Sequence, residues 1–274
     1  MAAKELNAIV SQRIEVTPSL IKLRVIPDGW ELPDFEPGQF GVLGLPGSAS
    51  RYSSAAPEEN PPDSEKLILR AYSVASSSVA KEYIEFYIGL VRSGSLTPRL
   101  LNLKRGDKLW VGPKFKGMFT LSEVPNEFNL VLIATGTGVA PYISMIRSEL
   151  AKGARHRFAV IHGACFSGDL GYHDELTTLA SANKNFTYMP ILSHAQDEVV
   201  PWKGHEGFVD KLWTDGTLEN SWGLHPTPEN THVFLCGNPL MIKSMVEVLE
   251  KENFIKHSKK SPGQVHTEQF FVKL

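Results

Sequence analysis

The sequence changes its pattern once, near residue 125, and this change limits the folds open to the chain. Before it, short runs rich in Val, Ile and Leu are separated by glycines and prolines. After it, apolar runs alternate with segments of helical period. Short strands between turn residues favour an antiparallel barrel, whereas strands alternating with helices predict a parallel sheet. We therefore expect an N-terminal antiparallel β-barrel over residues 1–124 and a C-terminal α/β doubly wound parallel sheet over 125–274.

The first part is expected to be built mainly from strands. The candidate strands are Ala8–Val16, Leu20–Ile26, Gln39–Leu45, Lys66–Ala75 and Tyr83–Val91. One helix interrupts them, with Thr97 suited to its N-cap, Pro98 to its first turn and Gly106 to its end. The polar, proline-broken stretch from Pro46 to Ser64 is interpreted as a long surface loop, an insertion to which we assign no function.

The second part is expected to contain buried strands that are followed by helices. The candidate strands are Asn129–Ala134, Phe158–His162, Phe186–Leu192 and His232–Cys236. A helix with Ile143, Ile146 and Leu150 on one face follows the first of them, and Pro239 begins another helix. The short segment Pro125-Asn126-Glu127 is interpreted as the linker between the two parts.

Composition and cysteine usage exclude several classes of function. The formal net charge of −2 gives no overall reason to expect nucleic-acid binding. The two cysteines, Cys165 and Cys236, form no C-x-x-C pair, so we expect no metal site and no cysteine-held cluster. Lone thiols fit a reducing compartment, and no signal peptide or long apolar stretch is present, so we expect a cytoplasmic protein without a membrane span.

Two turns follow apolar strands in the second part, where a doubly wound sheet binds its ligands. The first is Thr135-Gly136-Thr137-Gly138-Val139-Ala140-Pro141, and its glycines let the backbone approach a phosphate at a helix N-terminus. Pro141 stands where the usual dinucleotide motif has its last glycine, so a purely structural turn is an equal alternative. The second is Cys236-Gly237-Asn238-Pro239, in which a buried structural thiol is the alternative to a functional one.

The order of motifs along the chain resembles the ferredoxin–NADP⁺ reductase family, in particular its bacterial branch. The motifs are Arg70-Ala71-Tyr72-Ser73, Gly94-Ser95-Leu96-Thr97, the two turns above and the C-terminal run Glu268-Gln269-Phe270-Phe271-Val272. Each motif alone has a structural explanation; their order over nearly the whole chain is far more specific. The resemblance implies an enzyme with non-covalent FAD that exchanges a hydride with NADP(H) and single electrons with ferredoxin or flavodoxin.

The resemblance also implies roles for individual residues. The FAD-binding residues would be Arg70, Ala71, Tyr72, Ser73, Tyr87, Ser95, Leu96, Thr97, Thr137, Phe270 and Phe271. The nicotinamide nucleotide would contact Gly136, Gly138, Ala164, Cys165, Ser193, His194, Gly237, Asn238 and Pro239, with Thr137 near both ligands. Ser73, Cys236, Glu268 and Phe270 would surround the reacting atoms, with Ser73 near flavin N5 and the Phe270 ring over the flavin.

The expected partners of an adenosine 2′-phosphate are missing from this sequence. Bacterial relatives often carry basic residues at three positions that are here Cys165, His194 and Phe208. A largely neutral imidazole at pH 7 is a weaker anion partner than a guanidinium, although His194 or Lys203 could still contact the phosphate. NADP(H) stays the first choice from the resemblance, and NAD(H) is the alternative.

Three hypotheses remain for the function, and they differ in the electron acceptor. An acidic ferredoxin or flavodoxin would dock on a basic face. That face would be Lys104, Arg105, Lys108, Lys114 and Lys116, or Lys256, Lys259 and Lys260, although such lysines are more often merely solvated. The second hypothesis is an NADH-preferring reductase component for an oxygenase or for free flavin. The third, of another class, is a non-catalytic, reductase-like subunit that binds nucleotide for regulation.

Overall fold

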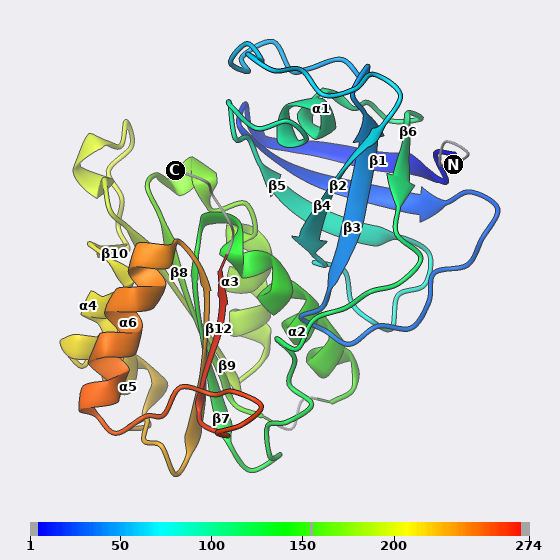
Figure 1. Ribbon diagram of the computed structural model, residues 1–274. Helices are drawn as coiled ribbons and strands as arrows, with labels where there is room; N and C mark the ends of the chain where they lie inside the picture. Colours follow the sequence, from blue (N-terminus) through cyan, green and yellow to red (C-terminus); the bar gives the residue numbers. More distant parts are fainter. Residues whose placement is uncertain (1–4, 154–155, 270–274) are drawn as a thin grey trace. The chain divides into compact units, whose positions relative to one another are not determined.

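The chain folds into two compact units in a computed structural model that describes residues 5–153 and 156–269 (Figure 1). One unit comprises Met1–Thr120 with Ala140–Ser148, and the other comprises Leu121–Val139 with Glu149–Leu274. The domain bounds 1–124 and 125–274 stay a prediction. In the described part of the chain, no helix is long and apolar enough to cross a membrane.

The first unit is the expected antiparallel barrel. Its strands are β1 (Ala8–Thr17), β2 (Leu20–Pro27), β3 (Phe40–Pro46), β4 (Leu67–Ser73), β5 (Ile84–Gly89) and β6 (Lys108–Val111). They pair antiparallel in the order β4-β3-β6-β1-β2-β5. A bridge between Val74 and Phe86 brings the two ends of this order together. Ile21, Leu23 and Phe86 are fully buried inside it, so the barrel holds a packed apolar core.

The helix of the first unit differs in detail from the expectation. It is α1 (Thr97–Asn102), and its buried residues Leu100 and Leu101 join the barrel core. Thr97 is the first helical residue and not the N-cap, because its hydroxyl binds both the N–H and the C=O of Val91. The helix ends at Asn102 and not at Gly106, which forms a separate turn at a φ of 93°.

The second unit contains the expected parallel sheet. Its strands are β7 (Asn129–Thr135), β8 (Phe158–Ala164), β9 (Phe186–Leu192), β10 (His205–Glu206), β11 (Thr231–Gly237) and β12 (Val265–Gln269), in the order β10-β9-β8-β7-β11-β12. All neighbouring pairs are parallel. The four central strands, β7, β8, β9 and β11, follow apolar runs that the sequence marks. The fold class is confirmed.

Helices connect the strands of this sheet. After β7 come the short turn η1 (Gly136–Val139) and α2 (Ala140–Ala151), and β8 leads into α3 (His173–Ala182), which contacts β9. The helices α4 (Val209–Thr214), α5 (Thr217–Trp222) and α6 (Pro239–Lys251) lie together against one face of the sheet (Figure 1). Leu212, Trp222 and Ile242 pack there against the strand residues Val131 and Ile161.

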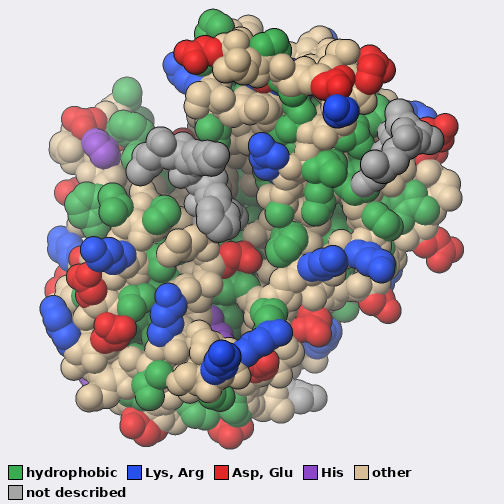
Figure 2. All heavy atoms as spheres, viewed as in Figure 1, with side chains coloured by type: hydrophobic (Ala, Val, Ile, Leu, Met, Phe, Trp, Pro, Cys, Tyr) green, Lys and Arg blue, Asp and Glu red, His purple; other side chains and the backbone are tan. Residues whose placement is uncertain are grey.

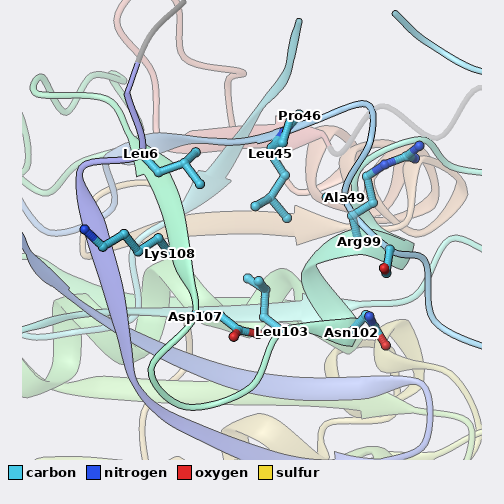
Figure 3. A pocket seen from close by; sticks show the side chains of 10 residues that line it. Leu6, Leu45, Pro46, Ala49, Arg99, Asn102, Leu103, Asp107 and Lys108 are labelled. Atoms are coloured by element: carbon cyan, nitrogen blue, oxygen red, sulfur yellow. The ribbon is translucent and has the colours of Figure 1, made fainter. Parts of the chain in front are cut away.

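A cavity of about 300 Å³ opens in the first unit beside α1 (Figure 3). It is lined by ten residues that include Leu6, Leu45, Arg99, Leu103 and Lys108. None of the predicted FAD-binding residues lines it. The cavity therefore lies apart from the residues on which the sequence analysis places the cofactor.

Candidate active site

The centre of the parallel sheet places the two predicted turns side by side. The strand order reverses at β7, since β8, β9 and β10 lie on one side of it and β11 and β12 on the other. Ligands of doubly wound sheets bind beyond the carboxyl ends of the strands at such a switch point. Gly136–Val139 follows β7 and Asn238-Pro239 follows β11, so both turns lie at that point.

The two turns approach each other too closely for side chains. A Cβ on Gly138 would lie 2.2 Å from the carbonyl oxygen of Cys236. A Cβ on Gly237 would lie 2.3 Å from Oγ1 of Thr135, and Gly237 also has a φ of 135°. The Thr135 hydroxyl accepts a hydrogen bond from the N–H of Asn238 at 2.9 Å. Both glycines are therefore required by packing, and Thr135 joins the turns.

A buried histidine supports the first turn from beneath. Nε2 of His162, in β8, lies 3.1 Å from the carbonyl oxygen of Gly136 and must carry the proton of that hydrogen bond. Burial lowers the pKa of His162 to about 4, so the ring is neutral near pH 7. Its Nδ1 lies 3.5 Å from the hydroxyl of Tyr188. Sequence reasoning missed His162, although a histidine in an apolar run was a signal.

The second turn begins α6 and adjoins a carboxylate. The side chain of Asn238 accepts from the N–H of Leu240 at 2.8 Å and so caps the helix. Cys236 is fully buried and pairs in register with Glu268 on β12. Burial, and then the charge of Glu268, raise the pKa of the Cys236 thiol well above its usual value. The thiol is therefore protonated, and it forms a small apolar wall at the strand end.

The ends of β8 and β9 bring together the residues predicted for the adenosine end of the nucleotide. The N–H of Ser193 donates to Ala164 O at 3.0 Å, and that of His194 donates to Cys165 O at 3.2 Å. The Ser193 hydroxyl lies 2.9 Å from Nδ1 of His194. The ring of Phe166 lies 5.6 Å from the His194 ring and is exposed. This surface is aromatic and polar.

Carboxylates follow directly after this surface. Glu198 accepts hydrogen bonds from the N–H and the hydroxyl of Ser167, the third residue after β8. Burial raises the pKa of Asp169, and the nearby charge of Glu198 raises it further. No Lys or Arg occurs in the described segments 164–169 and 193–198. The local charge is thus negative beside the strand ends.

In the first unit, β4 carries the motif predicted to hold FAD. Arg70 is exposed, and its Nη1 donates to Leu69 O at 2.7 Å. Tyr72 packs against the barrel core, and burial raises the pKa of its phenol above the usual value. Ser73 is buried, and Ala71, between Arg70 and Tyr72, is exposed. A free guanidinium edge and a half-buried ring on alternate positions of one strand suit a phosphate and a flat ligand ring.

The other predicted FAD residues differ in what they can offer. Tyr87 on β5 is only 4% exposed, and the side chain of Leu96 lies in the barrel core. Leu96 therefore offers a ligand only its backbone. Ser95 and Thr97 are half-buried. Phe270 and Phe271 lie outside the described residues, so their predicted roles are not addressed by the structure.

A family model described as the oxidoreductase NAD-binding domain matches residues 132–247, which include both turns. The flavodoxin/ferredoxin–NADP reductase of Buchnera aphidicola subsp. Baizongia pistaciae is 33% identical over 208 residues, covering 75% of this chain and 82% of the relative. The chain belongs to the flavodoxin/ferredoxin–NADP reductase family. The family member of Escherichia coli K12 is 31% identical over 209 residues, 76% of each chain.

The family assignment agrees with the fold of a solved relative. A ferredoxin NADP⁺ reductase from Neisseria gonorrhoeae, solved with bound FAD and NADP, matches with a TM-score of 0.81 at 24% identity, covering 97% of this chain and 98% of the other. The resemblance that the motifs indicated is confirmed. As a member of this reductase family the chain is an oxidoreductase enzyme. The roles of its individual residues stay predictions.

Proposed function

We propose that this reductase holds FAD on its first unit, exchanges a hydride with NADP(H), and passes single electrons to or from ferredoxin or flavodoxin. The observation that carries the proposal is the pair of mutually packed glycine turns at the switch point of the parallel sheet, in a chain of the flavodoxin/ferredoxin–NADP reductase family. The names of the relatives support the two classes of electron carrier.

The residues of the first unit fit a flavin dinucleotide. The exposed Arg70 would bind its diphosphate, and the ring of Tyr72 would lie against the flavin. Ser73 would donate its hydroxyl near the hydride-accepting nitrogen, with Tyr87 close to the flavin nucleotide. FAD supplies the conversion between a two-electron hydride and single electrons. The protein binds, orients and hydrogen-bonds it.

The second unit would present the nicotinamide nucleotide. Gly136, Thr137 and Gly138 would offer backbone to its phosphates, since the N–H groups at the start of a helix favour anions. Gly237, Asn238 and Pro239 would line the opposite side of the same edge, with Cys236 as a neutral wall. Glu268, paired with Cys236, would accept a hydrogen bond near the reacting atoms, as the resemblance implies, and Phe270 would cover the flavin.

The choice between NADPH and NADH would be made at the ends of β8 and β9. Arginine near this position accommodates a 2′-phosphate, and an acidic residue there binds a free ribose hydroxyl. Here Cys165 and His194 offer no permanent positive charge, and the nearby Glu198 carboxylate is hydrogen-bonded to Ser167. We therefore expect the enzyme to prefer NADPH over NADH by less than about tenfold in kcat/KM.

An acidic electron carrier would dock through basic side chains. The first-unit candidates are Lys104, Arg105, Lys108, Lys114 and Lys116, and Lys108 pairs with Asp28 at 2.8 Å. The second-unit candidates are Lys256, Lys259 and Lys260. On the face that Figure 2 shows, Lys and Arg are interspersed with Asp and Glu. Docking would thus depend on a local cluster of basic residues. We also propose that the protein is cytoplasmic.

An anaerobic titration tests the proposal. The purified protein should be yellow, NADPH should bleach its flavin absorbance, and added ferredoxin or flavodoxin should restore it. A colourless or redox-inert protein would instead support the nucleotide-binding subunit. A flavin that NADH reduces at least tenfold faster than NADPH, and that free flavin but neither carrier reoxidises, would support the oxygenase-type or flavin reductase.

A further inference from the structure

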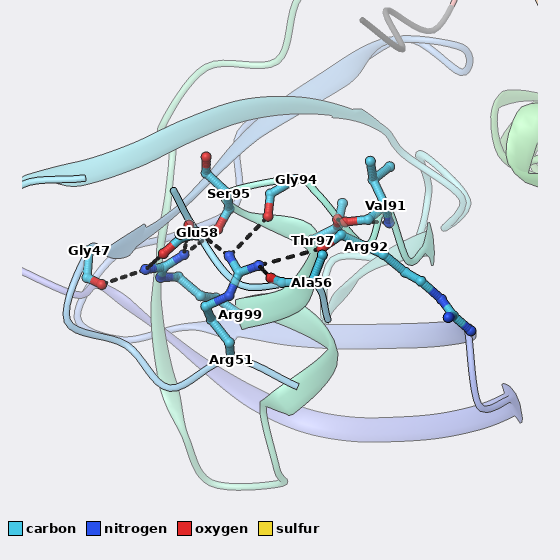
Figure 4. A network of polar contacts seen from close by, with 10 residues as sticks. All are labelled: Gly47, Arg51, Ala56, Glu58, Val91, Arg92, Gly94, Ser95, Thr97 and Arg99. Carbon is cyan, nitrogen blue, oxygen red and sulfur yellow. Dashed lines mark hydrogen bonds and ion pairs between the residues drawn. The ribbon is translucent and has the colours of Figure 1, made fainter. Parts of the chain in front are cut away.

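The long loop between β3 and β4 is fastened to the segment that precedes α1. Figure 4 shows two arginines, Arg51 from the loop and Arg99 from α1, on either side of the Glu58 carboxylate. Nη1 of Arg51 lies 2.7 Å from Glu58 Oε1. Arg99 binds both oxygens of Glu58, at 2.8 and 2.9 Å. All three side chains are at most 18% exposed, so water screens this network weakly.

Other donors of the two arginines bind backbone carbonyls of that segment and of the loop itself, where Arg51 donates to Ala56 O at 2.7 Å and Arg99 to Gly47 O at 2.6 Å. Arg51 donates to Gly94 O at 3.0 Å and to Arg92 O at 3.4 Å. Arg99 donates to Ser95 O at 2.6 Å. The main chain of the loop adds a contact, because the N–H of Ala56 also donates to Arg92 O, at 3.0 Å. The loop thereby holds the carbonyls of Arg92 and Gly94, and Arg99 of α1 holds that of Ser95.

Holding these carbonyls fixes the N–H groups on the other side of the same peptides. In a planar trans peptide, the C=O of one residue and the N–H of the next point in opposite directions. With Gly94 O and Ser95 O turned toward the arginines, the N–H groups of Ser95 and Leu96 point away from them. Leu96 O accepts from the N–H groups of Arg99 and Leu100, which turns the N–H of Thr97 back toward the start of the helix.

These three N–H groups have no acceptor within the part of the chain that the structure describes. The Thr97 hydroxyl, which binds Val91, adds a further fixed point to the segment. Successive N–H groups that face one way form an anion-binding concavity. The arrangement is prepared for a phosphate before any ligand arrives.

We propose that the β3–β4 loop is a clamp that orients the backbone N–H groups of Ser95, Leu96 and Thr97 for the diphosphate of FAD, with Arg51, Glu58 and Arg99 as positioning residues. None of the three needs to touch the cofactor. The inference deepens the proposed function and rests on FAD binding to the first unit. It gives the polar loop, interpreted from sequence as an insertion without a role, a place in cofactor binding.

The test exchanges arginine for lysine, which keeps the charge and loses the forked donor geometry. Arg51→Lys is the main variant, because one ammonium cannot reach the acceptors that its guanidinium binds. Arg13→Lys is the matched control. Arg13 is 19% exposed against 18% for Arg51, and it also donates to a carbonyl of α1, but to Leu101 O at the far end of the helix.

The affinities of apoprotein for FAD and for riboflavin, which lacks the diphosphate, are measured by flavin fluorescence, with the melting temperature of the apoprotein alongside. We expect Arg51→Lys to raise the Kd of FAD about tenfold and to leave that of riboflavin within twofold of wild type, with Arg13→Lys unchanged for both ligands. Arg99→Lys, at the more buried position, should raise the Kd of FAD at least as much.

The outcomes separate the clamp from the proposed function. Equal FAD affinity in wild type, Arg51→Lys and Arg99→Lys would overturn the clamp and leave FAD binding intact. An equal loss of FAD and riboflavin affinity would also overturn it, because the loop would then act only through general stability. A wild-type protein that binds no FAD would refute the proposed function itself.

Discussion

Replacing Gly138 with alanine tests whether the two turns at the switch point must touch. The new Cβ would lie 2.2 Å from Cys236 O and 2.7 Å from Cys236 C, whereas ordinary contact begins at 3.4 Å. Both obstacles are backbone, so no rotamer change can relieve the clash. The turn and the end of β11 would have to separate by about 1 Å, a change that overpacking data place near the upper end of about 1–3 kcal/mol.

The matched control is Gly136→Ala, two residues earlier in the same turn. A Cβ there meets nothing within 4 Å, although the φ of 53° adds some strain. That strain is about 1 kcal/mol for a left-handed residue. We therefore expect Gly138→Ala to lose about 2 kcal/mol more stability than Gly136→Ala by calorimetry.

NADPH binding should be weakened more by Gly138→Ala than by Gly136→Ala. If the nucleotide binds on these turns, Gly138→Ala should raise the Kd of NADPH roughly thirtyfold in stopped-flow reduction of the flavin, since 1.4 kcal/mol is a factor of ten. The Kd of FAD, which we propose binds to the first unit, should stay within twofold. The reasoning fails if Gly138→Ala is no less stable than Gly136→Ala and binds NADPH like the wild type.

Three further variants test other parts of the two sites. Cys165→Arg should raise the ratio of kcat/KM for NADPH over NADH about tenfold, because an exposed guanidinium gains a charge-assisted bond to the 2′-phosphate; an unchanged ratio would place that phosphate elsewhere. Ser73→Ala should slow hydride transfer far more than it weakens FAD binding, and equal stopped-flow rates would remove its role. Burial lowers the pKa of His232 to about 4 and of His266 to about 3. Below about pH 6.5 the unfolded chain therefore binds more protons than the folded chain. The free energy of unfolding should fall from there to about pH 4 by up to about 1.4 kcal/mol per pH unit for each ring. His266→Asn should make the free energy of unfolding, measured in urea, depend less steeply on pH over this range.

The His232 prediction rests on geometry as well as on burial. Nδ1 of His232 lies 2.9 Å from Nε2 of His266, so one ring must donate and the other accept. The His257 ring stacks on His266 and binds Glu123 at 3.0 Å, and the nearby charge of His156 also lowers the pKa of His232. If both Nδ1 of His232 and Nε2 of His266 carried a proton, two N–H groups would face each other and the hydrogen bond would be lost.

The sequence predicted the elements in which local pattern and tertiary environment agree. The strand β7 is a continuous apolar run, and α6 begins where Asn238 and Pro239 favour a helix start, so both match the structure closely. The strand β6 was missed because it has four residues, begins with an exposed lysine and gains its stability from pairing with β1 and β3. The edge strand β12 was missed for a similar reason, since Val265–Gln269 is mostly polar.

The candidate site shows the same division. Glycines and the Cys236–Pro239 turn were visible because close backbone approach needs particular residue types. The Arg51–Glu58–Arg99 network was not visible, because its members come from a loop and a helix separated in sequence and meet only in the folded barrel. His162 was missed because its partner, the Gly136 carbonyl, belongs to the neighbouring strand's turn.

His162 gives the first glycine turn a support that does not titrate in the physiological range. Its pKa of about 4 keeps the imidazole neutral from mildly acidic to alkaline pH, so Nε2 keeps its proton and donates it to the Gly136 carbonyl throughout that range. An exposed histidine at this place would change its charge near neutral pH. If the nicotinamide nucleotide binds on this turn, as we propose, the turn can keep one orientation while the hydride exchange releases and takes up protons.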